Sequence, residues 1–169
     1  GRFGAASAPP KKYYFCGVEE PQLFHTTKKP KMKSTNGKHP APLPDQRRED
    51  ELVRQIDRWL AHMTWRPDFA AWREGRIWQE RQQGERLRLI ERYGGALRGS
   101  RILDLGSGMG GTSVALALAG AHPLAFEYNR AYCDIIRLRA GRYALGLPVL
   151  NGAGERLPFA DASFDLAIA

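Results

Sequence analysis

The sequence predicts an α/β fold class: a doubly wound parallel sheet in the second half, preceded by a helical region and a flexible basic tail. From Arg101 onward, short apolar runs alternate with helical segments of about ten to fifteen residues, as in parallel strands joined by right-handed helical crossovers. Four glycines follow the first of these runs, between positions 106 and 111. The net charge of +8 lies entirely ahead of position 101, because residues 101–169 hold six basic and six acidic side chains.

Residues 1–44 are expected to form a flexible tail that is rich in proline and lysine. Prolines at positions 40, 42 and 44 disfavour a helix there, and every lysine of the chain lies at or before Lys38. The run KKPKMK, residues 28–33, would suit a contact with nucleic acid or an acidic partner. A solvated tail is the simpler expectation.

Residues 45–95 are predicted to form a helical cap region. Asp45 is a candidate N-cap, because it comes directly before a helical pattern. Apolar side chains then recur at spacings of three and four, which places them on one stripe of a helix. The stripe consists of Leu52, Val53, Ile56, Trp59, Leu60 and Met63.

A second helical stretch is predicted over residues 69–93, with a break near Gly84. Asp68 is its candidate N-cap, and Gly94–Gly95 is a C-terminal signal. The tryptophans of the helical region are expected in the core, with a substrate pocket as the alternative.

Residues 96–169 are predicted to form the sheet and its crossover helices. Strands are expected at RILDLG, HPLAFEYN, PVLNGAG and FDLAIA, and helices at GTSVALALAG and AYCDIIRLRAGRYALG. In such a sheet, ligands bind beyond the carboxyl ends of the strands, which is where the glycines lie. A side chain at Gly106 or Gly108 would occupy the space in which a ligand meets backbone N–H groups.

Two carboxylates accompany these glycines. Glu127 ends the second predicted strand, 21 residues after Gly106, and a carboxylate there suits the hydroxyl pair of a ribose. The spacing Gly106-x-Gly108-x-x-Gly111 also fits a nicotinamide dinucleotide. Asp104 argues against that reading, because it would repel a pyrophosphate, whereas it favours a cofactor that carries a cationic group.

Three segments resemble successive motifs of the class I methyltransferases that use S-adenosylmethionine. They are ILDLGSGMGGTSVALALAGA, AFEYN and GERLPFADASFDLAIA, and the resemblance covers about residues 85–169. The last of them is typical of members that act on small molecules. The resemblance implies a Rossmann-like sheet of which about four of seven strands are present, S-adenosyl-L-methionine as cofactor and methyl transfer as the reaction.

The resemblance also implies the cofactor-binding residues. Asp104 would lie near the methionine part, Glu127 would bind the ribose hydroxyls and Tyr128 would pack beside the adenine. The loop under the cofactor would consist of Gly106, Ser107, Gly108 and Gly110.

One position departs from the family pattern. Ala153 stands where related sequences carry an acid that contacts the adenine amino group. The Ala153 N–H could still meet the ring, and Glu155 or Asn151 could replace the acid. Loss of one such hydrogen bond would cost about 1 kcal/mol, or about fivefold to tenfold in affinity.

The chain is expected to be the cofactor-binding half of an enzyme. It has no initial methionine and ends at Ala169, near the fourth predicted strand, so a fragment without activity of its own is expected. The segments that usually position the methyl acceptor would follow, and the catalytic residues therefore stay unknown.

The acceptor is expected to be a small molecule, with nucleic acid as a less favoured partner. A nicotinamide-dependent oxidoreductase and a non-catalytic binding module with a degenerate methyltransferase fold are the alternative functions. The two cysteines and four histidines match no metal-ligand spacing, so no metal is expected. The cysteine usage and the lack of a signal peptide or a membrane-spanning run favour a cytoplasmic location.

Overall fold

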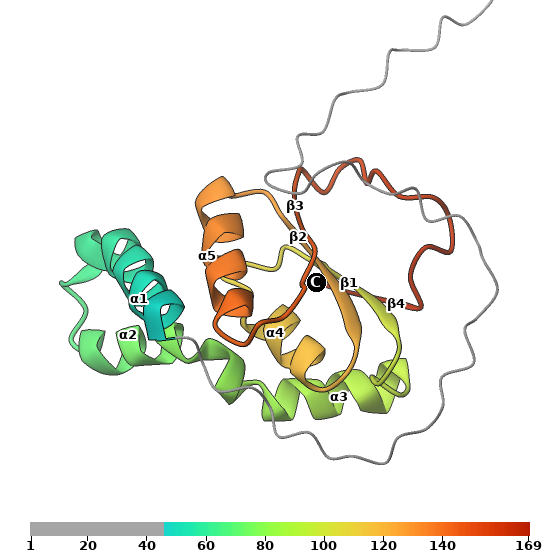
Figure 1. Ribbon diagram of the computed structural model, residues 1–169, viewed down its shortest axis with the longest axis horizontal. Coiled ribbons are helices and arrows are strands. Elements are labelled where there is room, and N and C mark those ends of the chain that lie inside the picture. Colours follow the sequence, from blue (N-terminus) through green and yellow to red (C-terminus); the bar gives the residue numbers. More distant parts are fainter. Residues whose placement is uncertain (1–45) are drawn as a thin grey trace, which may run out of the picture.

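The computed structural model describes residues 46–169, which contain one four-stranded, all-parallel sheet in the order β3-β2-β1-β4 (Figure 1). The predicted Asp45 cap and the flexible tail lie outside the described residues. The strands are β1 Arg101–Leu105, β2 His122–Glu127, β3 Val149–Asn151 and β4 Leu166–Ile168. This arrangement confirms the predicted fold class.

Each strand forms where an apolar run was predicted, and β1 lies in the middle of the sheet. Its residues pair on both sides, with Ile102 opposite Pro123 of β2 and opposite Leu166 of β4. Such a strand has no solvent face, which explains why Ile102, Leu103 and Asp104 are all buried. The carboxyl ends of β1 and β2 therefore meet at one edge of the sheet.

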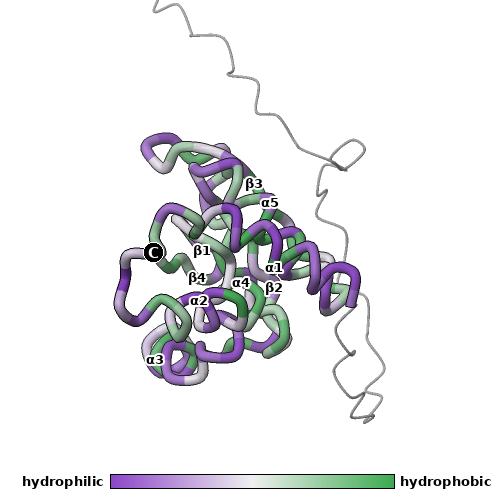
Figure 2. Tube along the Cα trace, turned by 90° about the vertical axis from the view of Figure 1, so that its left-hand side faces the viewer, coloured by the Kyte–Doolittle hydropathy of each residue, from purple (hydrophilic) through white to green (hydrophobic). Residues whose placement is uncertain are grey.

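The crossover helices are α4, Gly111–Leu118, and α5, Arg130–Gly141. The side chain of Asn129 caps α5 by accepting a hydrogen bond of 3.0 Å from the Ala131 N–H. Helix α4 is apolar from Val114 to Leu118, the kind of residue that Figure 2 colours green, and six of its eight residues are buried. It therefore lies inside the molecule rather than on its surface.

The N-terminal helical region consists of α1 Gln46–Leu60, the 3₁₀ turn η1 Ala61–Met63, α2 Phe69–Ile77, the 3₁₀ turn η2 Gln79–Gln82 and α3 Gly84–Gly94. The predicted stripe of α1 is confirmed, since Leu52, Ile56 and Leu60 are fully buried. These side chains form one apolar cluster with Met109 and Ile135 of the α/β part. A division into a cap and a cofactor-binding unit stays a prediction.

The helix boundaries confirm one predicted signal and overturn another. Helix α3 ends at Gly94, and Gly95 follows with a φ of 90°. Asp68 precedes α2 as predicted, but its carboxylate does not cap the helix. Both of its oxygens instead accept hydrogen bonds of 3.1 Å from Arg66, because a guanidinium two residues away offers two parallel donors.

Three of the four tryptophans pack where the core reading predicted. Trp59, Trp72 and Trp78 lie against the cluster of Leu52 and Ile56. Trp65 does not, because it is 75% exposed. Among residues 46–169, no helix combines the length and the apolar composition that crossing a bilayer requires.

Candidate functional site

The glycine loop, residues 106–110, begins where β1 ends and runs beside the end of β2. The N–H groups of Gly106 and Ser107 lie 2.8 and 3.2 Å from the carbonyl oxygen of Phe126, which ties the loop to β2. Gly106 and Gly108 have φ values of 71° and 57°, which L-residues rarely adopt. A Cβ added at either position would have no neighbouring atom within 4 Å, so both backbones border open space.

Gly110 needs to be glycine for a different reason. Its φ is 80°, and an added Cβ would lie 2.7 Å from Cγ1 of Ile136 in α5. The next glycine, Gly111, packs in the same way against the side chain of Gln79. The four glycines therefore divide into two that border open space and two that allow close packing. That the Gly110 backbone lies under a cofactor stays a prediction.

Glu127 reaches from the end of β2 into the glycine loop. Its Oε2 accepts a hydrogen bond of 2.8 Å from the Gly108 N–H, and its Oε1 accepts one of 2.7 Å from the Asn129 N–H. Each carboxylate oxygen has two acceptor positions, so both keep one after these bonds. The carboxylate thus fixes the loop and remains able to accept from a ligand.

Asp104 lies beneath the loop, near the end of β1, and is 3% exposed. Its Oδ2 accepts a hydrogen bond of 2.5 Å from the Ser113 hydroxyl. Burial raises the pKa of Asp104 above its ordinary value, while the Ser113 bond and the charge of Arg86 lower it and the charge of Glu127 raises it. In the sheet Asp104 lies opposite Ala125, two residues before Glu127, so the two carboxylates share one edge of the sheet.

The other predicted site residues surround this edge in different ways. The Ser107 hydroxyl lies 2.8 Å from the carbonyl oxygen of Asp104, inside the loop. Tyr128 is 78% exposed directly after β2. Ala153 and Glu155 are exposed in the segment that follows β3.

Asn151, one of the two suggested replacements for the missing acid, uses its amide nitrogen in contacts within the chain. Its side-chain amide donates hydrogen bonds of 2.8 and 2.7 Å to the carbonyl oxygens of Glu127 and Tyr128. It therefore braces the end of β2 against β3. The amide oxygen, which makes neither of these bonds, is the acceptor that an adenine amino group would need, so Asn151 and Glu155 both stay predictions as replacements for the acid.

Three residues that contact or act on Asp104 and the loop were not predicted from the sequence. Arg86 extends from α3, and its Nη2 lies 3.4 Å from the carbonyl oxygen of Ala169 after β4. Ser113 bonds Asp104, and Arg139 donates to the carbonyl oxygen of Met109 within the loop. One feature of the sequence indicates that Arg139 is unusual. It follows Ile135 by four residues and therefore lies on the apolar side of α5.

Part of this chain is similar to known proteins. Residues 102–169 match the family described as a methyltransferase domain. A demethylmenaquinone methyltransferase of Corynebacterium efficiens is 35% identical over 92 residues, which are 54% of this chain and 34% of that protein. One from Clavibacter sepedonicus is 40% identical over 40% of this chain and 27% of its own length. The chain thus spans about a third or less of these relatives.

A solved structure covers more of the chain at lower similarity. It is a phosphoethanolamine N-methyltransferase of Haemonchus contortus in complex with phosphoethanolamine and S-adenosylhomocysteine. It is 16% identical, with a TM-score of 0.41, over 72% of this chain and 25% of its own.

Proposed function

We propose, from the match of residues 102–169 to the methyltransferase-domain family, that this protein binds S-adenosyl-L-methionine and takes part in methyl transfer to a small-molecule acceptor. One observation carries the cofactor assignment. The backbones of Gly106 and Gly108 border open space beside a carboxylate that is already hydrogen-bonded to the Gly108 N–H.

The residues at this edge fit an adenosyl cofactor. A Cβ at Gly106 or Gly108 would enter the open space, so glycine keeps the backbone within reach of a ligand. Glu127 retains an acceptor position on each oxygen, which matches the two hydroxyls of a ribose. Asp104 is a buried negative charge, and a cationic ligand beside it would offset part of the cost of its burial.

When bound, S-adenosylmethionine supplies a methyl group on a cationic sulfur atom. The chain's own residues bind and orient: Glu127 accepts from the ribose, and Asp104 provides negative charge near the methionine part. Tyr128 and Glu155 are proposed to contact the adenine, together with the N–H of Ala153. Methyl transfer depends mainly on such placement of the reactants, and we assign no catalytic residue.

The proposal of a small-molecule acceptor is supported by the demethylmenaquinone methyltransferases among the relatives, which are named for such a substrate. A cytoplasmic location remains a prediction that rests on the sequence. The nicotinamide-dependent alternative is tested directly by the cofactor measurement that follows.

Isothermal titration calorimetry with S-adenosylhomocysteine tests the cofactor assignment. The unchanged protein is expected to bind one equivalent. Glu127→Ala removes two hydrogen bonds to a charged acceptor, and a net loss of about 3 kcal/mol would weaken binding by roughly a hundredfold. Asp134→Ala is the matched control, because it removes an exposed acid that pairs with Arg137 on α5 instead. It should leave the affinity unchanged.

Two outcomes would contradict the proposal. One is the absence of S-adenosylhomocysteine binding at millimolar concentration. The other is tighter binding of NAD than of S-adenosylhomocysteine, which would favour the nicotinamide reading.

A further inference from the structure

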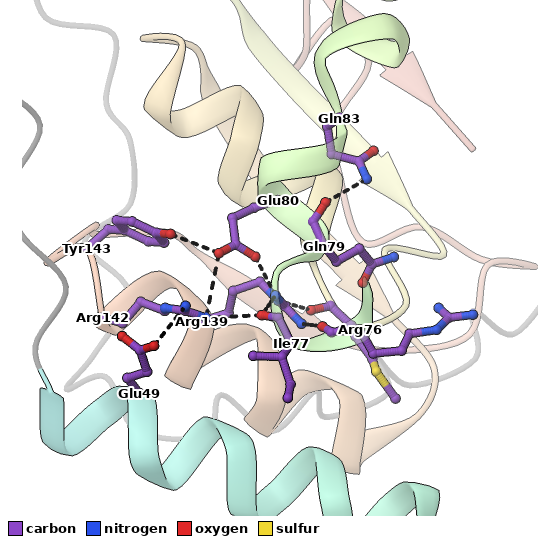
Figure 3. Close-up of polar contacts among 10 residues, drawn as sticks. Glu49, Arg76, Ile77, Gln79, Glu80, Gln83, Arg139, Arg142 and Tyr143 are labelled. Carbon is purple, nitrogen blue, oxygen red and sulfur yellow. Dashed lines mark hydrogen bonds and ion pairs between the residues drawn. The ribbon is translucent and has the colours of Figure 1, made fainter. Parts of the chain in front are cut away.

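We infer that Arg139 of α5 is a positioning residue for the glycine loop, and that Glu80 of η2 holds Arg139 in place. The consequence for cofactor affinity rests on the proposed function, whereas the effect on the loop does not. The two residues belong to a buried polar cluster that joins the N-terminal helices to the α/β part (Figure 3).

Arg139 uses its guanidinium in several directions at once. Its Nε donates a hydrogen bond of 2.8 Å to the carbonyl oxygen of Met109. Its Nη1 and Nη2 donate bonds of 2.9 and 2.7 Å to the carbonyl oxygens of Ile77 and Arg76 at the end of α2. Nη1 also donates to Oε2 of Glu80. A lysine ammonium has three donors at one point and cannot span these acceptors.

The loop is held at Met109 from two sides. The Met109 side chain is 5% exposed and packs with Ile56 and Ile135, while its carbonyl oxygen accepts from Arg139. The residue before it, Gly108, donates its N–H to Glu127. Glycine has wide conformational freedom, so contacts from outside the loop are needed to fix Gly108 and Gly110 in one conformation.

Glu80 supplies the charge that this arrangement requires. Both Glu80 and Arg139 have fully buried side chains, and burial lowers the pKa of Arg139 while Glu80 raises it. Glu80 also accepts a hydrogen bond of 2.9 Å from the Tyr143 hydroxyl. Removal of the carboxylate would leave a buried guanidinium without this partner, which is strongly unfavourable.

Arg142 offers an internal control for a merely structural role. Arg142 comes directly after α5 and is as fully buried as Arg139. Its Nη1 lies 3.5 Å from Oε1 of Glu80. Its Nη1 donates to the carbonyl oxygen of Ile77 and its Nη2 lies 3.7 Å from Oε1 of Glu49. The two arginines therefore share the cluster, but the bond to the loop belongs to Arg139.

Hydrogen–deuterium exchange on the full chain compares Arg139→Lys with Arg142→Lys. Arg139→Lys should speed exchange of the Gly108 and Gly110 amides at least tenfold, and Arg142→Lys should leave them within twofold of the unchanged protein. Should Arg139→Lys fail to fold, Glu80→Gln keeps the shape of the side chain and should speed the same amides. Equal exchange in the loop for all variants would overturn the inference.

Titration of the same variants with S-adenosylhomocysteine separates this inference from the proposed function. Arg139→Lys should weaken binding at least fivefold, at a temperature where every variant is folded, and Arg142→Lys should not. Equal affinity of both variants would overturn the link from Arg139 to the cofactor. No binding by the unchanged protein would contradict the proposed function, while the exchange result would still decide the role of Arg139 in the loop.

Discussion

Replacing Gly108 or Gly110 with alanine distinguishes a glycine that is needed for ligand binding from a glycine that is needed for close packing. Both have a positive φ, of 57° and 80°, so both variants carry backbone strain. Their surroundings differ. The new Cβ at Gly108 meets no atom within 4 Å, whereas at Gly110 it would lie 2.7 Å from Ile136 Cγ1 and 2.9 Å from its Cγ2.

These contacts set the expected free energies of unfolding. A left-handed alanine costs about 1–2 kcal/mol, and this is the whole expected loss for Gly108→Ala. Gly110→Ala adds overpacking of about 1–3 kcal/mol, for a total of about 2–5 kcal/mol. At about 2–4 °C per kcal/mol for a chain of this length, Tm should fall by about 2–8 °C for Gly108→Ala and by about 4–20 °C for Gly110→Ala.

Affinity should follow the opposite order. Thermal unfolding gives the stability of each variant, and calorimetry with S-adenosylhomocysteine below both transitions gives the affinity of the folded form. Gly108→Ala should lose more affinity than Gly110→Ala although it is the more stable of the two. The reasoning would be refuted by Gly108→Ala binding as tightly as the unchanged protein, or by Gly110→Ala being no less stable than Gly108→Ala.

Two further predictions concern pH. The raised pKa of Asp104 means that its stabilising contribution is present below its ordinary pKa and is lost as the pH rises through the folded value. Asp104→Asn should therefore gain in Tm relative to the unchanged protein as the pH rises above 3.8, the ordinary pKa of the carboxyl, while losing cofactor affinity, and a Tm difference independent of pH would contradict this. Asp165 behaves in the opposite sense: hydrogen bonds from the Arg101 side chain and N–H hold its pKa at about 2, so its contribution is present above pH 3.8 and lost as the pH falls toward 2. The Tm deficit of Asp165→Asn should shrink over that range, and a constant deficit in thermal unfolding would count against the role of this pair.

The spacing of apolar residues and the positions of glycine and proline predicted the strands and the main helices, but not the two 3₁₀ turns, η1 and η2. The stripe from Leu52 to Leu60 is buried as its spacing required, and the parallel pairing of the strands follows from the alternation of apolar runs and helices. That alternation does not specify the order of the strands in the sheet. The position of Glu127 also followed, because the carboxyl ends of parallel strands meet at one edge. That its carboxylate accepts the Gly108 N–H depends on the exact loop conformation, which no spacing rule specifies.

Features that depend on contacts distant in sequence could not be predicted. Glu80 and Arg139 are 59 positions apart, and the place of Arg139 on the apolar side of its helix does not indicate which residue it pairs with. Gly110 and Gly106 look alike in the sequence, and the packing of Ile136 distinguishes them in the structure. The prediction that Asp68 caps α2 failed because of a contact that is local in sequence. Arg66 binds the Asp68 carboxylate, which the backbone N–H groups would otherwise bind.

The most direct test of the cofactor site is a map of where the ligand binds. Amide resonances of the nitrogen-15-labelled protein are followed by NMR as S-adenosylhomocysteine is added. The account predicts the largest shifts at Gly106, Gly108 and Tyr128, at the ends of β1 and β2. Saturable shifts confined to residues away from this edge, or no shifts at millimolar ligand, would contradict it.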